Sequence, residues 1–479
     1  MPTRRAFLQS SAGALAAASL PAAEKKANIL FIMPDQLRAQ ALGCMGNVDV
    51  RTPHINRIAA EGLLFRNTFA NTPVCCPARA NILTGKYAHK NGMTANDLRL
   101  RESEPTLAEV LGKSGYRTGF VGKWHLDGGK RLPGFVPPGP RRHGFEFWAA
   151  NECNHSHFHS QYFRDTDQPI PIDKFEPEVW AELGIEFLQG AKTDARPFFL
   201  TVQMGPPHDP YKAPPEYSKL YDPQRLTMRP NWQAKPGMPG PVEIAEYYGM
   251  VTAVDDQIGR LMKSLDEFGL RDDTIVLISS DHGDMLGSHG RQLKRKPWEE
   301  SIHVPGILRY PRRVKARRTS DVFFTHVDFA PTLLSLCGIK PPAGMQGTDL
   351  GDHVAGHESG GPDSAFFQIF GPYEGDGTED GWRGVRTERY MYARFESKPW
   401  VLYDLLQDPS EMRNLLDDRR APAILREMEH RLDGWMRRTG DSWKNDWHEL
   451  VEDKGRLYTQ DQVFYSVNEY LTWAAARLQ

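Results

Sequence analysis

The feature that most constrains the fold of this chain is a set of four short apolar runs, each followed by polar residues. The runs cover residues 28–33, 117–121, 197–204 and 274–279. The polar residues after them include Asp35, Lys123, His208 and Asp281. Runs of this length and composition are typical of strands buried on both faces of a sheet.

Helical patterns separate these runs. In residues 106–114 and 245–268, Leu, Val, Ile and Met recur at the spacing of one helix face. Strands that alternate with helices indicate an α/β fold with a large, mostly parallel sheet sandwiched by helices. Ligands of such sheets bind at the carboxyl ends of the strands, so we expect the four polar clusters to converge on one edge.

The composition changes after about residue 340. Residues 341–361 are rich in Gly, Pro and Asp, and short strand-like pieces follow at 365–370, 384–386, 390–395 and 401–404. Residues 421–439 alternate apolar and charged side chains as a surface helix does. We therefore expect a catalytic α/β domain at 24–360 and a smaller C-terminal α+β subdomain with an antiparallel sheet at 361–479.

Composition excludes several classes of protein. The 479 residues include 59 Lys or Arg and 61 Asp or Glu, which leaves a formal charge of −2 and argues against nucleic acid as a partner. No stretch of 18 apolar residues occurs, so we expect no membrane span. Five cysteines are an odd number and too few for a disulfide scaffold, so at least one is unpaired or chemically used.

The first 23 residues resemble a twin-arginine export signal. Arg4 and Arg5 precede an apolar run of small residues that reaches Ala18, and Ala22-Ala23 precedes a charged segment. The order of these features matches a bacterial signal peptide, and the alternative is a frayed basic terminus. We expect a periplasmic or secreted protein.

The segment from Cys75 to Gly85 is the most informative part of the sequence. Pro77 suits the first turn of a helix, which would place Cys75 at a helix N-terminus that favours an anion. Arg79 adds a positive fork that can hold an oxyanion or orient a nucleophile. The alternative is that Cys75 and Cys76 are packed small hydrophobic residues.

Two motifs in order resemble the signatures of the type I, formylglycine-dependent sulfatases of the alkaline-phosphatase-like superfamily. The first is Cys-x-Pro-x-Arg followed by a helix that ends in Thr-Gly, and only Cys75 has proline and arginine at the required offsets; Cys76 does not. The second runs from Gly115 to His125. The likeness extends from about Asn28 to Leu416.

The resemblance implies a mechanism and a role for each matching residue. Cys75 would be oxidised to formylglycine by a formylglycine-generating or anaerobic maturing enzyme. Lys123 would hold the sulfate and His125 would act as base, while His208, or Lys294, would protonate the leaving alcohol. The family places a further lysine five residues before a glutamate, a spacing that Lys294 meets with Glu299 and Lys296 does not. Lys123, Lys294 and Arg79 would stabilise charge on the sulfuryl oxygens.

The resemblance also implies a divalent metal. Its expected ligands are the modified residue 75, Asp35, Gln36, Asp281 and His282. The family expectation is Ca²⁺, but Gln36 replaces the usual carboxylate and His282 the usual amide, which leaves room for Mn²⁺. We expect Asp284 to support the metal ligands without binding the metal.

Four further residues are candidates for contact with a sugar. His155 and His157 belong to a segment that alternates three histidines, for which a second metal site is the alternative. His289 and Trp298 lie near the expected Lys294, and ordinary packing is the alternative for both.

The sequence therefore predicts a sulfatase that hydrolyses sulfate esters, most readily of a sulfated carbohydrate. The first alternative is a phosphonate or phosphate ester hydrolase of the same superfamily. The second is a catalytically silent glycan-binding protein in which Cys75 remains a thiol.

Overall fold

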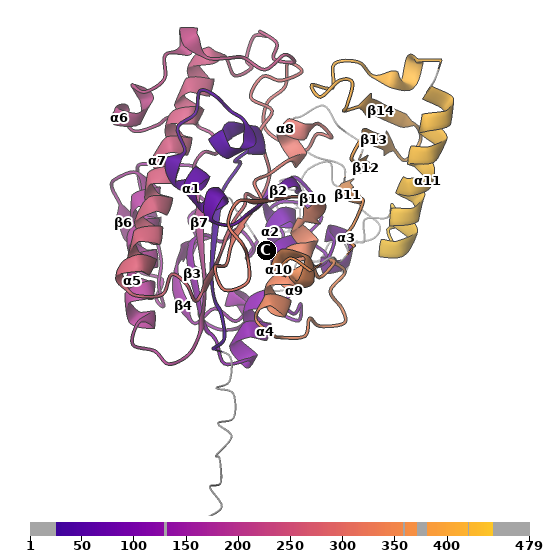
Figure 1. Ribbon diagram of the computed structural model, residues 1–479. Helices are drawn as coiled ribbons and strands as arrows, with labels where there is room; N and C mark the ends of the chain where they lie inside the picture. Colours follow the sequence, from indigo (N-terminus) through magenta and orange to yellow (C-terminus); the bar gives the residue numbers. More distant parts are fainter. Residues whose placement is uncertain (1–24, 129–131, 358–359, 371–380, 420, 444–479) are drawn as a thin grey trace, which may run out of the picture.

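An eight-stranded sheet forms the centre of the molecule, with strand order β10-β2-β9-β8-β1-β7-β3-β4 (Figure 1). Its strands are β1 Asn28–Pro34, β2 Leu63–Phe69, β3 Arg117–Lys123, β4 Phe147–Asn151, β7 Phe198–Met204, β8 Thr274–Ile278, β9 Ile307–Arg309 and β10 Arg318–Thr325. The computed structural model describes residues 25–128, 132–357, 360–370, 381–419 and 421–443. The export signal expected at 1–23 lies outside these residues.

The sheet is parallel except at one strand. β8, β1, β7 and β3 are consecutive neighbours and run in the same direction, whereas β9 runs antiparallel to β8 and β2. These four neighbours are the four apolar runs, so the predicted, mostly parallel sheet is confirmed. The charged and polar residues after them consequently share one edge.

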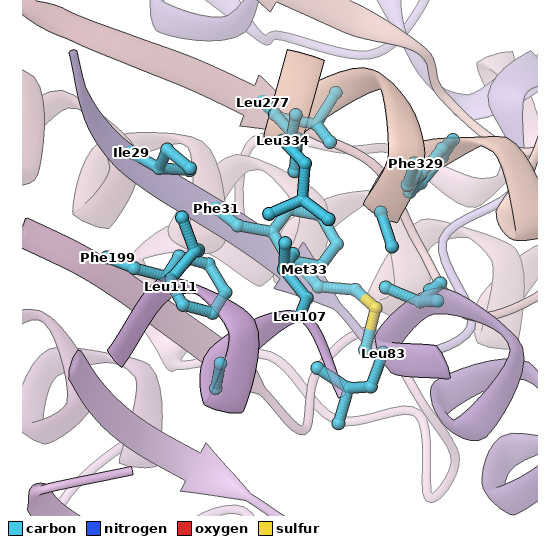
Figure 2. Close-up of a cluster of buried hydrophobic side chains, with 14 of the residues drawn as sticks. Ile29, Phe31, Met33, Leu83, Leu107, Leu111, Phe199, Leu277, Phe329 and Leu334 are labelled. Carbon is cyan, nitrogen blue, oxygen red and sulfur yellow. The ribbon is translucent and has the colours of Figure 1, made fainter. Parts of the chain in front are cut away.

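Helices cover both faces of the sheet because β1 alternates its side chains between two cores. Phe31 and Met33 pack on one face with residues of α2 Cys75–Thr84, α4 Leu107–Lys113 and α9 His326–Leu336 (Figure 2). Leu30 and Ile32 pack on the other face with residues of α1 Pro53–Glu61, α5 Glu176–Ala191 and α7 Pro241–Glu267. A strand of this kind has no polar face, which explains its uninterrupted apolar run.

The predicted helices form with small changes at their ends. The helix expected at 106–114 is α4. The Thr106 side chain accepts from the backbone N–H of Glu109, and the Glu109 side chain accepts from the backbone N–H of Thr106. The helix expected at 245–268 is α7, which begins earlier because Pro241 takes its first position and Glu243 accepts from the N–H of Gly240.

A second sheet follows in the C-terminal part. Its antiparallel strands are β11 Ser364–Ile369, β12 Trp382–Thr387, β13 Tyr390–Phe395 and β14 Pro399–Asp404, in chain order. Helix α11, Ala421–Thr439, covers one face, where Met428 and Leu432 join a core with Tyr392. The predicted antiparallel sheet with a helix is confirmed; the domain boundary at residue 360 stays a prediction.

The remaining elements are short. They are β5 Ser160–Tyr162, β6 Ile170–Ile172, α3 Ala88–Asn91, α6 Pro215–Ser218, α8 Glu299–Ile302, α10 Gly351–Ala355, η1 Ala39–Ala41, η2 Gly43–Met45, η3 Pro140–Arg142, η4 Pro223–Arg225 and η5 Leu415–Asp417. Among the residues described, no helix combines the length and apolar character needed to cross a membrane.

Candidate active site

The polar residues that follow the central strands meet at the carboxyl edge of the sheet. Asp35 follows β1 and Lys123 ends β3, and the Lys123 ammonium lies 2.7 Å from Asp35 Oδ2. Asp281 follows β8, and its Oδ1 accepts the backbone N–H of Gln36 at 3.0 Å. The register of the parallel strands therefore brings together residues that are far apart in the sequence.

Cys75 enters this cluster from the first turn of α2. Val74 is extended, α2 begins at Cys75, and Pro77 lies in the first turn as the sequence predicts. The Cys75 Sγ is buried and lies 3.2 Å from His282 Nε2. The helix N-terminus thus directs the thiol towards the carboxylates after β1 and β8.

The surroundings of Cys75 favour a negative charge. Burial raises the pKa of the Cys75 thiol, but Lys294, His282 and Lys123 overcome this effect and hold it well below its ordinary value. The neighbouring thiol behaves differently, because burial raises the pKa of Cys76 to about 11. Of these two adjacent cysteines, only Cys75 lies where an anionic oxygen or sulfur would be stabilised.

Arg79 orients the carboxylates of the cluster. Its Nη2 donates to Asp35 Oδ2 and to Asp281 Oδ2, both at 3.0 Å. Its Nη1 donates to the Lys123 carbonyl and to Gln203 Oε1. Arg79 is 1% exposed and positions two carboxylates, while its Nε is buried without a hydrogen-bond partner among the described residues; its contact with a sulfuryl group stays a prediction.

Four side chains in the cluster can hold a divalent cation. Donor atoms of Asp35, Cys75, Asp281 and His282 all lie within 4.8 Å of one another, and all four side chains are buried. Asp35 Oδ1 has no hydrogen-bond partner among the described residues. A cation about 2.0–2.6 Å from each donor fits such spacings. The donors present therefore fit the metal that the resemblance implies.

The orientation of His282 supports the same conclusion. Its Nδ1 donates to the Gly283 carbonyl at 3.0 Å, so Nε2 is the nitrogen that faces the cluster. Nε2 lies 3.7 Å from Asp35 Oδ1 and 3.8 Å from Asp281 Oδ1. Burial lowers the pKa of His282, but Asp281 and Cys75 reverse this and raise it, so a positive charge, from a proton or a metal cation, is favoured between Nε2 and the carboxylates.

Gln36 lies at the edge of this group, and three neighbours hold its side chain. Its Oε1 accepts from Lys294 at 2.7 Å, and its Nε2 donates to Asp284 Oδ2 at 2.6 Å and Asp209 Oδ1 at 3.3 Å. Asp284 therefore fixes the amide, as a supporting residue would. The place of Gln36 among the metal ligands stays a prediction.

Lys294 and His208 form a buried pair on the other side of Gln36. Lys294 Nζ donates to His208 Nε2 at 2.9 Å, and His208 Nδ1 donates to the Asp209 carbonyl at 2.7 Å. The first contact joins the loop after β8 to the loop after β7. The structure thus brings Lys294 into the cluster, while its functional role stays a prediction.

His125 contacts a carboxylate that the sequence reading missed. Its Nε2 lies 3.2 Å from Asp97 Oδ1, while its Nδ1 is buried and has no hydrogen-bond partner among the described residues. When Nε2–H donates to Asp97, Nδ1 is left as a proton acceptor. His125 also contributes to lowering the pKa of Cys75.

The three alternating histidines do not share one face of a strand. The segment 154–159 has no strand structure, so its side chains reach different places. The His155 ring stacks on His208, with centroids 4.7 Å apart and planes 8° apart. His157 is buried between Glu176 Oε1 and the His208 carbonyl, and His159 is exposed. His155 therefore borders the site, whereas His157 braces the loop that carries His208.

Trp298 and His289 pack against each other away from this cluster. Their rings stack with centroids 4.7 Å apart, and Trp298 Nε1 donates to the Tyr403 hydroxyl at 3.2 Å. Trp298 is only 6% exposed and belongs to the core between the two sheets. Because protein covers its ring, Trp298 acts in packing, which was the alternative to contact with a sugar.

Gln203 and Asp97 are the site residues that sequence reasoning missed. Gln203 accepts from Arg79, and it is the polar residue near the end of the apolar strand β7, which is a usable signal. Asp97 lies in a loop between α3 and α4 and has no motif around it.

Comparison with known proteins agrees with the fold and identifies the family. The model of the sulfatase family matches residues 27–339, and the model of the N-sulphoglucosamine sulphohydrolase C-terminal region matches residues 287–438. The chain belongs to the sulfatase family, with the alkaline-phosphatase-like fold, and it is a sulfuric ester hydrolase.

Three relatives illustrate the similarity. An ulvan-active sulfatase of Formosa agariphila is 35% identical over 88% of this chain and 83% of its own length. An N-acetylglucosamine-6-O-sulfatase of Bacteroides thetaiotaomicron is 28% identical over 82% of this chain and 83% of its own length. A solved structure of a sulfatase-family protein from Bacteroides fragilis is 31% identical, with a TM-score of 0.81, over 89% of this chain and 98% of its own.

Proposed function

We propose that this protein removes sulfate from a sulfated carbohydrate, using residue 75 as the nucleophile after its conversion to formylglycine. The observation that carries the proposal is the position of Cys75 at the N-terminus of α2, with Sγ 3.2 Å from His282 and inside a four-residue donor set. A nucleophile at this place is surrounded by cationic side chains that favour anionic oxygens.

Asp35, Gln36, Asp281 and His282 would hold the metal, which we expect to be Ca²⁺, with Mn²⁺ as the alternative because His282 supplies nitrogen. When bound, a divalent cation supplies polarisation of the nucleophile and of a sulfuryl oxygen. Burial raises the pKa of Asp35, but Lys123, His208 and Arg79 reverse this and hold it well below its ordinary value. Asp35 is therefore ionised and ready to bind a cation at neutral pH.

Formylglycine would supply a hydrated aldehyde, whose two hydroxyls allow attack and release without a second attack at sulfur. Its formation requires a formylglycine-generating or anaerobic maturing enzyme as a partner. Cys76 is not a substitute for Cys75, because its thiol accepts from the backbone N–H of Asp97 and is not a member of the four-residue donor set.

Lys123 and Lys294 would bind the sulfate group. Both ammonium groups are buried at the edge of the metal cluster, where a sulfuryl anion would replace part of their present hydrogen bonding. Because the site excludes water, their interaction with developing negative charge is stronger than it would be at the surface.

His208 would protonate the leaving alcohol. The Asp209 carbonyl accepts from Nδ1, so Nε2 is the nitrogen that exchanges a proton, and Lys294 at 2.9 Å can supply one. His125 would act as the base in the second step through its unpaired Nδ1, because Asp97 orients the ring through Nε2.

The substrate class rests on the relatives. The ulvan-active sulfatase and the N-acetylglucosamine-6-O-sulfatase both bear names of saccharide sulfatases, and we extend that class to this chain. We propose that His155, which stacks on His208, lines the saccharide subsite. The twin-arginine sequence at 1–23 supports a periplasmic or secreted location, where such polymers are encountered.

A peptide mass measurement tests the nucleophile. Protein co-expressed with a maturing enzyme should carry formylglycine at position 75, and Cys75→Ala should lower sulfatase activity at least ~10³-fold. Cys76→Ala is the matched control and should retain activity. An unmodified Cys75 in fully active protein would refute the proposal and would favour a different nucleophile.

A substrate panel tests the reaction class. The matured protein should release sulfate from defined sulfated mono- and disaccharides with a larger kcat/KM than it shows for an aryl phosphonate. The reverse order would favour the phosphonate hydrolase alternative. Binding of sulfated saccharides without turnover, by protein from the native host in which Cys75 remains a thiol, would favour a glycan-binding role.

A further inference from the structure

A second group of metal-ligating side chains lies outside the catalytic cluster. One donor atom from each of His289, Glu300 and Glu411 lies within 4.8 Å of the others. They come from three segments: the loop after β8, helix α8, and the loop after β14. Figure 1 shows α8 on the side of the large domain that faces β12–β14. Both glutamates are fully buried, with exposed fractions of 0% and 1%.

Each glutamate has one bonded oxygen and one free oxygen. Glu300 Oε1 accepts from Arg229 Nε at 2.6 Å, and Glu411 Oε2 accepts from the backbone N–H of Glu299 at 2.9 Å. Glu300 Oε2 and Glu411 Oε1 are buried without a hydrogen-bond partner among the described residues. A buried carboxylate oxygen without a partner is costly, so a donor or a cation is needed here.

Asn231 does not satisfy this need. Its Nδ2 has two hydrogens but faces three acceptors: Glu300 Oε1 at 2.8 Å, the Ser410 carbonyl at 3.0 Å and His289 Nε2 at 3.1 Å. At least one acceptor lone pair is therefore left over. Burial, together with Glu299 and Glu300, raises the pKa of Glu411 well above its ordinary value, as expected for a carboxyl beside other carboxylates.

We propose that His289, Glu300 and Glu411 bind a divalent cation of borderline character, such as Zn²⁺ or Mn²⁺, at a site separate from the catalytic metal. One imidazole nitrogen and two carboxylate oxygens form a donor set that suits these ions better than Ca²⁺ or Mg²⁺. Trp298 stacks on His289 and fixes the ring in place. This reading gives His289 a role other than contact with a sugar.

The cation would be structural and would link two parts of the molecule. His289 lies in the same loop as Lys294, and Glu411 belongs to the C-terminal subdomain. Binding would tie the loop that carries a catalytic lysine to the smaller sheet. The cation lowers the repulsion between Glu300 and Glu411, so its removal should loosen this junction.

Metal content tests the proposal. Wild-type protein is stripped with EDTA, dialysed against Zn²⁺ and then against metal-free buffer, and analysed by elemental mass spectrometry. Wild-type protein should carry one equivalent of Zn²⁺ more than Glu411→Gln, in which the amide donates to Glu300 and keeps the fold. Asp281→Asn, which alters the catalytic site, should keep the equivalent that Glu411→Gln loses. Equal metal content in wild type and Glu411→Gln would overturn the proposal.

Anomalous diffraction from wild-type crystals soaked in Zn²⁺ gives a second test that requires no variant. We expect a peak at the zinc edge between His289, Glu300 and Glu411. No peak there, with Glu300 and Glu411 in direct hydrogen-bond contact through a shared proton, would overturn the proposal. Neither result depends on sulfatase turnover, so the test is independent of the proposed substrate.

Discussion

The ammonium of Lys294 lies 2.7 Å from the side-chain oxygen of Gln36. This contact is set by the other end of the amide, because Gln36 Nε2 donates to Asp284 Oδ2 at 2.6 Å. A neutral amide is therefore required at position 36, where a carboxylate would face the buried Asp284.

Replacement of Gln36 tests this requirement. Gln36→Glu should lower kcat/KM about 10- to 100-fold, the usual effect of disturbing residues around a metal site. Asp284→Asn in the Gln36→Glu background should restore part of the activity, because the donor and the acceptor are then exchanged. Steady-state kinetics of the two variants provides the measurement, and a double variant no better than Gln36→Glu would contradict it.

Lys123 is expected to contribute more to the reaction than to folding. Lys123→Ala should lower kcat/KM by about 10²- to 10³-fold, because a buried cation beside Asp35 and the nucleophile is lost. Lys86, which pairs with Glu104 at 2.7 Å outside the cluster, provides the matched control. Lys86→Ala should leave kcat/KM within a few-fold of wild type, and a comparable loss in both variants would argue against a direct role for Lys123.

Removal of metal should abolish activity, and Arg79 should set how tightly the metal is held. EDTA treatment followed by dialysis should yield inactive protein that Ca²⁺ or Mn²⁺ restores. Arg79→Lys should need about 10- to 100-fold more metal for half-maximal recovery, because lysine cannot reproduce the fork that orients Asp35 and Asp281. Recovery of both proteins at the same metal concentration would show that Arg79 does not support the ligands.

Stability should fall in mild acid partly through His143. Burial lowers the pKa of His143 to about 4, so the unfolded chain takes up this proton first as the pH falls below about 6.5. The native state therefore loses about 2 kcal/mol between pH 7 and 5 from this group. His143→Asn, which tolerates the positive φ of this position, should show a correspondingly smaller decrease in the free energy of unfolding.

Urea unfolding at several pH values measures this difference. The exposed His357 offers a control, since His357→Asn should follow the wild-type dependence on pH. A His143→Asn profile parallel to that of the wild type would contradict the prediction.

The sequence was sufficient for the central architecture because local signals and the fold agreed there. A short apolar run such as residues 28–33 is typical of a strand with both faces covered, and β1 has that position. The same reasoning placed Asp35, Lys123 and Asp281 at one edge, because parallel strands present their carboxyl ends together. Motif spacing indicated Cys75 and Lys294 as candidates, and the structure places them beside His282 and Gln36, respectively.

Other contacts were decided only in three dimensions. Nothing around Asp97 indicates that it meets His125, and the alternation of His155 and His157 suggested a shared face that an irregular loop does not provide. The sequence allowed Trp298 to contact a sugar, whereas in the structure residues of the C-terminal sheet cover its ring.

The sequence by itself determined the four central strands, their order along the chain and the polar residues that follow them, because apolar periodicity and motif spacing are local properties of the chain. The tertiary structure decided which polar atoms are left without partners. Asp35 Oδ1, Glu300 Oε2 and Glu411 Oε1 are such atoms among the described residues. Hydrogen-bond satisfaction depends on segments hundreds of residues apart, so it exists only after the sheet and its loops have assembled.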